Sequence, residues 1–220
     1  MPNWCDNQIT ITGPNSVIDK IEKIVKEESN NAENGLLQFF HPMPKELLET
    51  EAGPIAKTKK EKQARQIRKL EFGAENWYDW RVNNWGTKWE VCEFYGVDRQ
   101  HLNDSLDEST ISFSFSSAWA PPIGAYEKFL ENNSNCFLRA YYYEGGCDFM
   151  GLWEDGIDDC YAPSDYKSTD DFWQDGVGST LDDMFNITES MAEYEAEQEA
   201  EKEDVHEYTK GKAMNIGEEV

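Results

Sequence analysis

The residues that most often carry out chemistry are sparse in this chain. Its three histidines have no partner at metal-ligand spacing, and no glycine-rich phosphate motif or nucleophile motif occurs. Cys5 could act as a nucleophile, but no histidine lies near it in sequence to generate a thiolate, so we expect a buried thiol. The acids between residues 155 and 171 lack the spacing of a calcium loop. We predict no catalytic residue, no metal ligand and no cofactor.

Binding chemistry is better represented, in the stretch ENWYDWRVNNWGTKWEV at residues 75–91. This stretch holds four tryptophans within thirteen positions, with asparagines and basic residues between them. Tryptophan rings offer flat apolar walls, lysine offers a charge and asparagine offers directional donors, a combination that suits an anionic aromatic ligand. The alternative is packing alone, because tryptophan is usually buried and asparagine usually serves turns. We expect Trp77, Trp80 and Trp89 to belong to the core.

The charge of the chain is strongly negative and uneven. The net charge is −24; residues 144–220 hold 23 acids and 4 basic residues, whereas residues 1–143 hold 21 acids and 16 basic residues. Such a field repels free nucleic acid and attracts a basic protein surface, including one that normally holds nucleic acid. The alternative is a solvated acidic tail that only aids solubility.

The compartment follows from two absences in the sequence. No stretch reaches the eighteen apolar residues of a membrane span, and the start MPNWCDNQ does not resemble a signal peptide. The five cysteines form no C-x-x-C pair and suit reduced thiols. We expect a cytoplasmic protein without a membrane partner, located in the host cytosol if a phage encodes it.

Hydrophobic periodicity predicts the elements that must position these side chains. The run DNQITITG alternates as a half-buried strand does, and apolar residues recur at helical spacing between 17 and 25. Two more strands are predicted in TKWEVCEFYGV and STISFSFSSAW, a helix in APPIGAYEKFLENN and a hairpin in CFLRAYYYEGGCDFMGLWEDG. This order is the β-α-β-β-α-β plan of a ferredoxin-like antiparallel sheet, an α+β fold, with one extra hairpin strand.

Two segments lie outside that plan. A helical insertion is predicted at about 41–84: after the extended run LLQFFHPMP, a basic helix starts near Lys57 and continues as an apolar stripe from Ile67 to Trp80. The second segment is an acidic C-terminal extension, 161–220, which follows the domain at 1–160. Ser179 and Asp182 form a capping box there and predict a helix over about 179–208.

Four motifs within residues 1–160 resemble a known family. They are similar to motifs of the YubB-like ferredoxin-like domain family of phage and plasmid accessory proteins, and they occur in the same order. The resemblance implies the fold and a mobile-element setting, but no reaction and no catalytic residue. The motifs are Pro2-Asn3-Trp4-Cys5 with Asn7, Asn84-Trp85-Gly86-Thr87-Lys88-Trp89, Ala118-Trp119-Ala120-Pro121-Pro122, and YYEGGCDFMG at residues 142–151.

The expected fold brings these four motifs to one rim of the sheet. In strand order 4-1-3-2, the first and second strands begin at the edge where the third and fourth end. The second helix also begins there and offers unpaired N–H groups to an anion. The alternative is that the rim residues only hold the rim together. As a site, the rim is expected to contact its ligand through Trp4, Asn7, Asn84, Trp85, Lys88 and Trp119.

Two functions remain open. The first is a non-enzymatic phage or plasmid accessory protein that binds a host protein with a basic surface, as a counter-defence inhibitor whose acidic surface mimics nucleic acid. The second is binding of a nucleotide-like anion, or an enzyme activity, at the rim around Trp85 and Lys88. Direct nucleic-acid binding through the basic helix is disfavoured by the net charge. The partner-binding residues of the first function are Asp182, Asp183, Glu193, Glu197 and Glu201.

Overall fold

The computed structural model describes residues 3–27, 34–53, 58–102, 107–193 and 196 of the 220. The chain forms two compact units, Met1–Tyr161 and Ala162–Val220, and each is described by itself. The sequence-based boundary was placed after residue 160. Within the described residues, no helix is both long enough and apolar enough to cross a membrane.

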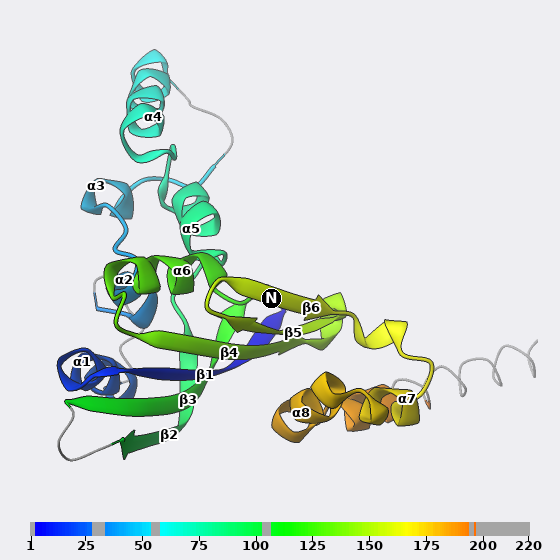
Figure 1. Cartoon of the computed structure of the whole chain (residues 1–220). Coiled ribbons are helices and arrows are strands. Elements are labelled where there is room, and N and C mark those ends of the chain that lie inside the picture. The colour runs from blue at the N-terminus through cyan, green and yellow to red at the C-terminus, as the bar shows by residue number, and fades with distance from the viewer. Residues whose placement is uncertain (1–2, 28–33, 54–57, 103–106, 194–195, 197–220) are drawn as a thin grey trace, which may run out of the picture. The chain divides into compact units, whose positions relative to one another are not determined.

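The first unit is built on one antiparallel sheet of six strands, in the order β2-β3-β1-β4-β5-β6 (Figure 1). All neighbouring strands are antiparallel, so the predicted α+β class with an antiparallel sheet is confirmed. The predicted extra hairpin strand is present as β5, and a further strand, β6, follows it that was not predicted. The strands are β1 (Trp4–Pro14), β2 (Cys92–His101), β3 (Glu108–Ala118), β4 (Phe137–Glu144), β5 (Phe149–Glu154) and β6 (Ile157–Tyr161).

The hydrophobic core lies on one face of this sheet. Strand β1 pairs with β3 so that Ile9 lies opposite Phe113 and Ile11 opposite Ile111, all fully or almost fully buried. Alternate residues of a strand point to opposite faces, so each strand supplies every second side chain to the core. Helices α1 (Asn15–Lys26) and α6 (Ile123–Asn132) cover this face with apolar side chains that include Ile21.

Among the described residues between α1 and β2, four helices form the insertion. They are α2 (Leu36–Phe40), α3 (Lys45–Leu48), α4 (Lys59–Phe72) and α5 (Trp77–Trp85). The predicted extended run LLQFFHPMP was wrong, since its first five residues form α2 and bury Leu36, Leu37 and Phe40. Pro42 and Pro44 therefore follow the end of helix α2, and not the end of the expected extended run. In Figure 1, α4 is the element of this unit that lies farthest from the sheet.

The predicted continuous helix through Ile67 and Trp80 was also wrong. Helix α4 ends at Gly73, whose φ of 77° is left-handed, a conformation that glycine adopts without strain. Helix α5 starts anew after Asn76, whose side-chain oxygen accepts hydrogen bonds from two backbone N–H groups. Because of this break, the apolar residues of α4 and those of α5 do not share one helix face. Ile67 is therefore exposed, while Trp80 is buried.

The second unit contains short helical segments. These are a 3-10 turn, η2 (Pro163–Asp165), then α7 (Thr169–Gln174), α8 (Gly176–Phe185) and helical residues 187–193. The predicted single helix from Ser179 was wrong: α8 begins at Gly176, capped by Asp175, and ends at Asn186, which is left-handed. The predicted continuation from 197 to 208 lies outside the described residues.

Candidate binding site at the rim of the sheet

Three segments that are far apart in sequence meet at one end of the sheet. Trp4, the first residue of β1, lies opposite Ala118, the last residue of β3. The hydroxyl of Thr87 donates a 2.7 Å hydrogen bond to the Ala118 carbonyl oxygen, which fixes the link between α5 and β2 at the same place. The next residue in each chain segment, Lys88 and Trp119, therefore reaches the same rim.

An exposed cluster of aromatic rings surrounds one lysine at this rim. The ammonium of Lys88 lies 4.1 Å from the ring centroid of Trp89 and 5.4 Å from that of Trp119, both within cation–π range. The Trp4 and Trp89 rings are 6.1 Å apart. Trp4, Trp89 and Trp119 remain 43%, 38% and 43% exposed. We call these four residues the rim cluster; it offers stacking faces and one positive charge to solvent.

Trp119 holds its place in the rim cluster with an unusual backbone. Its φ is 73°, in the left-handed region that a bulky side chain rarely adopts. Its backbone N–H donates a 3.0 Å hydrogen bond to the carbonyl oxygen of Asn3. This conformation costs on the order of 1 kcal/mol, and such strain is found where surrounding structure enforces a particular side-chain direction.

Two of the predicted rim residues are structural. Trp85 is fully buried, and its indole N–H donates a 2.8 Å hydrogen bond to the His41 carbonyl oxygen. The expectation that Trp85 sits in a turn entering the second strand was wrong, because it is the last residue of α5 and β2 starts only at Cys92. Asn84 uses its amide within the same helix, donating to the Trp80 carbonyl oxygen at 2.8 Å.

Trp89 is the residue that sequence reasoning missed. It was expected in the core on a strand face shared with Val91, but β2 begins after both residues and the Trp89 ring is exposed. The available signal was its position directly after Lys88, in a segment without clear alternation.

Asn7 lies inside the core and not at the surface. Its side-chain N–H groups donate to the Cys5 carbonyl oxygen and to the Ser117 hydroxyl, each at 2.8 Å. The amide thus links β1 to the end of β3 from within. Cys5 is fully buried, and burial raises the pKa of its thiol, which suits the expected buried thiol.

Carboxylates also lie close to the rim. The Ser116 hydroxyl oxygen lies 3.4 Å from an Asp6 carboxylate oxygen and 3.2 Å from one of Glu93, so its single proton has two acceptors within reach. Burial, followed by the nearby Glu93 charge, raises the pKa of Asp6. The buried carboxylate of Glu144 accepts the Gly146 N–H at 3.0 Å, so the fourth motif is held by its own turn.

Two buried ionisable residues, Glu90 and Arg81, belong to the chain segments on either side of Lys88 and Trp89. Glu90 accepts hydrogen bonds from the N–H groups of Leu37, at 2.7 Å, and Gln38, at 3.2 Å. Burial raises the pKa of Glu90 to about 7. The Arg81 guanidinium lies 4.7 Å from the Trp85 ring centroid; burial lowers its pKa, and the nearby Glu90 charge opposes that shift.

The acidic extension presents part of the predicted partner-binding set. Asp183 and Glu193 are exposed. Asp182 is buried, and its two carboxylate oxygens accept hydrogen bonds from the N–H and the hydroxyl of Thr188 at 2.6 and 2.9 Å. The expectation that Asp182 is accessible to a partner was therefore wrong. Glu197 and Glu201 lie outside the described residues.

No metal site is evident in the part of the chain that the structure describes, since no three His, Cys, Asp or Glu side chains there are grouped to hold an ion.

No family model matches the chain. No curated protein matches it either. Among solved structures, the chain is similar to the crystal structure of the protein api92 from Yersinia pseudotuberculosis, of the family DUF1281. The two are 13% identical with a TM-score of 0.37, over 75% of this chain and 96% of that chain.

Proposed function

We propose that the protein is a non-enzymatic binding protein that occupies a basic surface of another protein through its acidic extension. The observation that carries this proposal is that, among the described residues of the extension, apolar side chains are buried while most acidic side chains are exposed. Phe172, Leu181 and Ile187 are buried, whereas six of the eight acids between residues 162 and 193 are exposed. Residues 162–193 contain eight acids and one basic residue, Lys167.

Charge at this density acts mainly on association. A surface of one sign raises the rate at which an oppositely charged partner docks, and this steering weakens as salt screens it. A host protein that normally holds nucleic acid offers such a basic surface. The four-motif resemblance to phage and plasmid accessory proteins supports a cytoplasmic counter-defence role in which the extension mimics nucleic acid.

The experiment is removal of the extension. A chain ending at Tyr161 should still unfold in a cooperative melting transition, because the hydrophobic core belongs to the first unit. It should lose the host partner that the full-length chain retains in a pull-down. Retention of that partner by a folded, shortened chain would refute the proposal.

The rim cluster favours a second function, binding of an anionic aromatic small molecule such as a nucleotide. An aromatic ring could stack on Trp4 or Trp119 while its anionic group pairs with Lys88. In a thermal-shift screen, a nucleotide that binds should raise the melting temperature of the wild type but not that of Lys88→Ala. Lys128→Ala is the matched control, because Lys128 pairs with Glu131 on α6. No shift across a broad library would defeat this function.

We also propose that the first unit has a ferredoxin-like core. Strands β4, β1, β3 and β2 are neighbours in that order, α1 follows β1, and α6 follows β3. This succession is the expected plan with β5 and β6 added beyond β4.

A further inference from the structure

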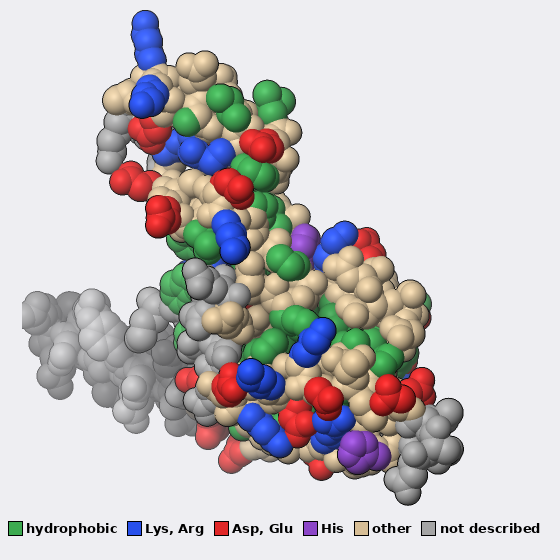
Figure 2. All heavy atoms as spheres, turned by 90° about the vertical axis from the view of Figure 1, so that its left-hand side faces the viewer, with side chains coloured by type: hydrophobic (Ala, Val, Ile, Leu, Met, Phe, Trp, Pro, Cys, Tyr) green, Lys and Arg blue, Asp and Glu red, His purple; other side chains and the backbone are tan. Residues whose placement is uncertain are grey.

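Helix α4 combines exposed cations with large exposed aliphatic side chains. Leu70 is 89% exposed and Ile67 is 53% exposed. Four lysines on the same helix, Lys59, Lys60, Lys62 and Lys69, are exposed as well. Figure 2 shows basic and hydrophobic side chains together at the upper end of the first unit, where Figure 1 places α4. Burying one such aliphatic side chain contributes about 1.5–3 kcal/mol, so this face leaves a favourable interaction unused.

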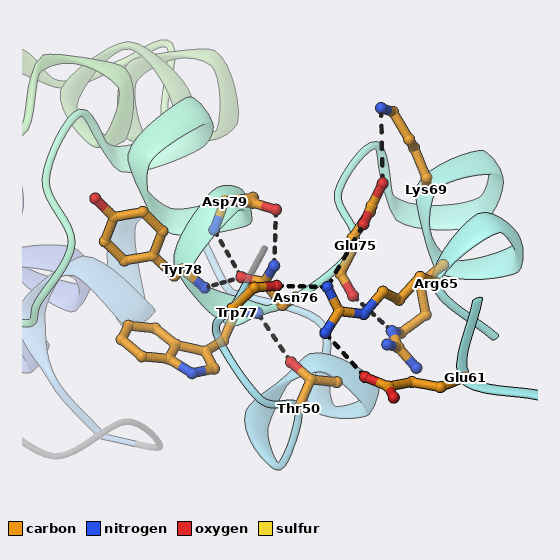
Figure 3. Close-up of polar contacts among 11 residues, drawn as sticks. Thr50, Glu61, Arg65, Lys69, Glu75, Asn76, Trp77, Tyr78 and Asp79 are labelled. Carbon is orange, nitrogen blue, oxygen red and sulfur yellow. Dashed lines mark hydrogen bonds and ion pairs between the residues drawn. The ribbon is translucent and has the colours of Figure 1, made fainter. Parts of the chain in front are cut away.

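The helix is anchored by its opposite side. Arg65 is buried, donates to the Glu61 carboxylate at 2.9 Å and also donates to the Gly53 carbonyl oxygen (Figure 3). Arg68 donates to the Glu75 carbonyl oxygen at 2.7 Å. The contacts with Gly53 and Glu75 fix α4 to its neighbouring segments through polar groups, whereas the pair with Glu61 lies within the helix, and Ile67 and Leu70 take no part in these contacts.

The exposed side forms a continuous ridge. Lys59, Gln63, Gln66 and Leu70 follow one another at intervals of four, three and four residues, which places them on one line along the helix. Ile67 lies beside this line, three residues before Leu70. The apolar pair lies on the C-terminal half of α4, beside Lys69, which also lies 3.9 Å from the Glu75 carboxylate, while Lys59, Lys60 and Lys62 lie on its N-terminal half.

We propose that α4 is a docking surface for an acidic, amphipathic peptide segment of a partner protein. Ile67 and Leu70 pack against apolar side chains of that segment, and the surrounding lysines pair with its carboxylates. This interaction is independent of the acidic extension and of the basic surface proposed for its partner.

The chemistry of the face favours a peptide over a nucleic acid. A phosphate backbone would use the lysines but would leave Leu70 and Ile67 without an apolar contact. The net charge of −24 also repels a long polyanion, whereas a short acidic segment meets chiefly the local charge of α4. Complementarity in both charge and apolar area therefore selects the peptide.

The test is a binding titration with a defined probe and the full-length chain. The probe is a fluorescently labelled peptide of about four helical turns, with leucines at intervals of three and four among glutamates. Its anisotropy should rise saturably with wild-type protein. The Ile67→Ser/Leu70→Ser variant should bind about tenfold more weakly, since two apolar anchors are lost. Lys60→Glu/Lys62→Glu should also weaken binding and reduce its dependence on salt, because both lysines are exposed on α4. Leu102→Ser is the control, because Leu102 is also 53% exposed but lies after β2.

Three results would overturn the proposal. One is the absence of wild-type binding up to about 1 mM peptide. Another is equal affinity for a probe in which serines replace the leucines, which would mean attraction by charge alone. The third is tight binding of a single-stranded oligonucleotide that Ile67→Ser/Leu70→Ser leaves unchanged, which would assign the face to nucleic acid. Circular dichroism of each variant confirms that the fold is retained.

Discussion

The backbone N–H of Trp119 donates a 3.0 Å hydrogen bond to the carbonyl oxygen of Asn3, and this contact joins the end of β3 to the residue before β1. It holds Trp119 in the left-handed region, at φ 73°. Glycine accepts this conformation without a Cβ clash, whereas alanine does not. We expect Trp119→Gly to be about 1 kcal/mol more stable to urea than Trp119→Ala, although both lose the same ring.

The comparison of these two variants isolates the backbone from the side chain. In a helix or strand interior, glycine is normally the less stable of the two. If Trp119→Gly were less stable than Trp119→Ala, the left-handed conformation of residue 119 would be excluded. Both variants should lose any ligand that stacks on the rim cluster.

Asn7 should prove to be a structural residue and not a ligand contact. Asn7→Ala removes two buried hydrogen bonds of 2.8 Å and leaves a small cavity. We expect the free energy of unfolding to fall by about 2–3 kcal/mol in chemical denaturation. If the free energy of unfolding changed by less than about 0.5 kcal/mol and the variant lost a rim ligand, Asn7 would be a ligand contact after all.

Glu90 should make stability depend on pH. Its pKa is raised from 4.5 to about 7 in the folded chain, so the folded state holds the proton more tightly than the unfolded state. The resulting stabilisation is fully present below pH 4.5 and is lost as pH rises through about 7, an effect on the order of 3 kcal/mol. Glu90→Gln removes this contribution.

The measurement is the difference in unfolding free energy between Glu90→Gln and wild type at several pH values. This difference should shift in favour of the variant between pH 5 and pH 8, whatever the other carboxylates do, because they are common to both chains. Glu71→Gln, an exposed position on α4, is the matched control. A difference that does not change with pH would show that Glu90 titrates normally.

Neighbouring acids in the extension should behave differently. Asp182→Ala removes the acceptor of the Thr188 N–H, so hydrogen exchange at that amide should become about tenfold faster or more. Asp183 is exposed, and Asp183→Ala should leave exchange unchanged while it weakens partner binding slightly. Equal exchange in the two variants would argue against the Asp182 contact.

Strands with one buried face were the easiest elements to predict. Ile9 and Ile11 alternate with polar residues because only one side of β1 meets the core, and the same holds for Ile111 and Phe113 on β3. The strand β6 gave no such signal, since four of its five residues are exposed. Its pairing depends on the β5 edge and therefore could not be predicted from its own sequence.

The rim was predicted in outline but not residue by residue. Motif order placed Trp4 and Trp119 close together, because antiparallel pairing sets the start of β1 beside the end of β3. Lys88 precedes β2 and is brought to the same place by the Thr87 hydrogen bond to Ala118. The choice between Trp85 and Trp89 depended on where α5 ends, which is marked by Gly86, left-handed at φ 89°. Gly73 and Asn76 carried the signal for the helix break, as a C-terminal glycine followed by an N-capping residue.

The most direct test of the central claim keeps the whole chain and changes only its charge. A variant with amides in place of the exposed acids of the described extension should fold as wild type does and should lose the host partner in a pull-down. A partner retained equally by this variant and by wild type at the same salt concentration would contradict the account. The substituted residues are Asp165, Asp170, Asp171, Asp183, Glu189 and Glu193.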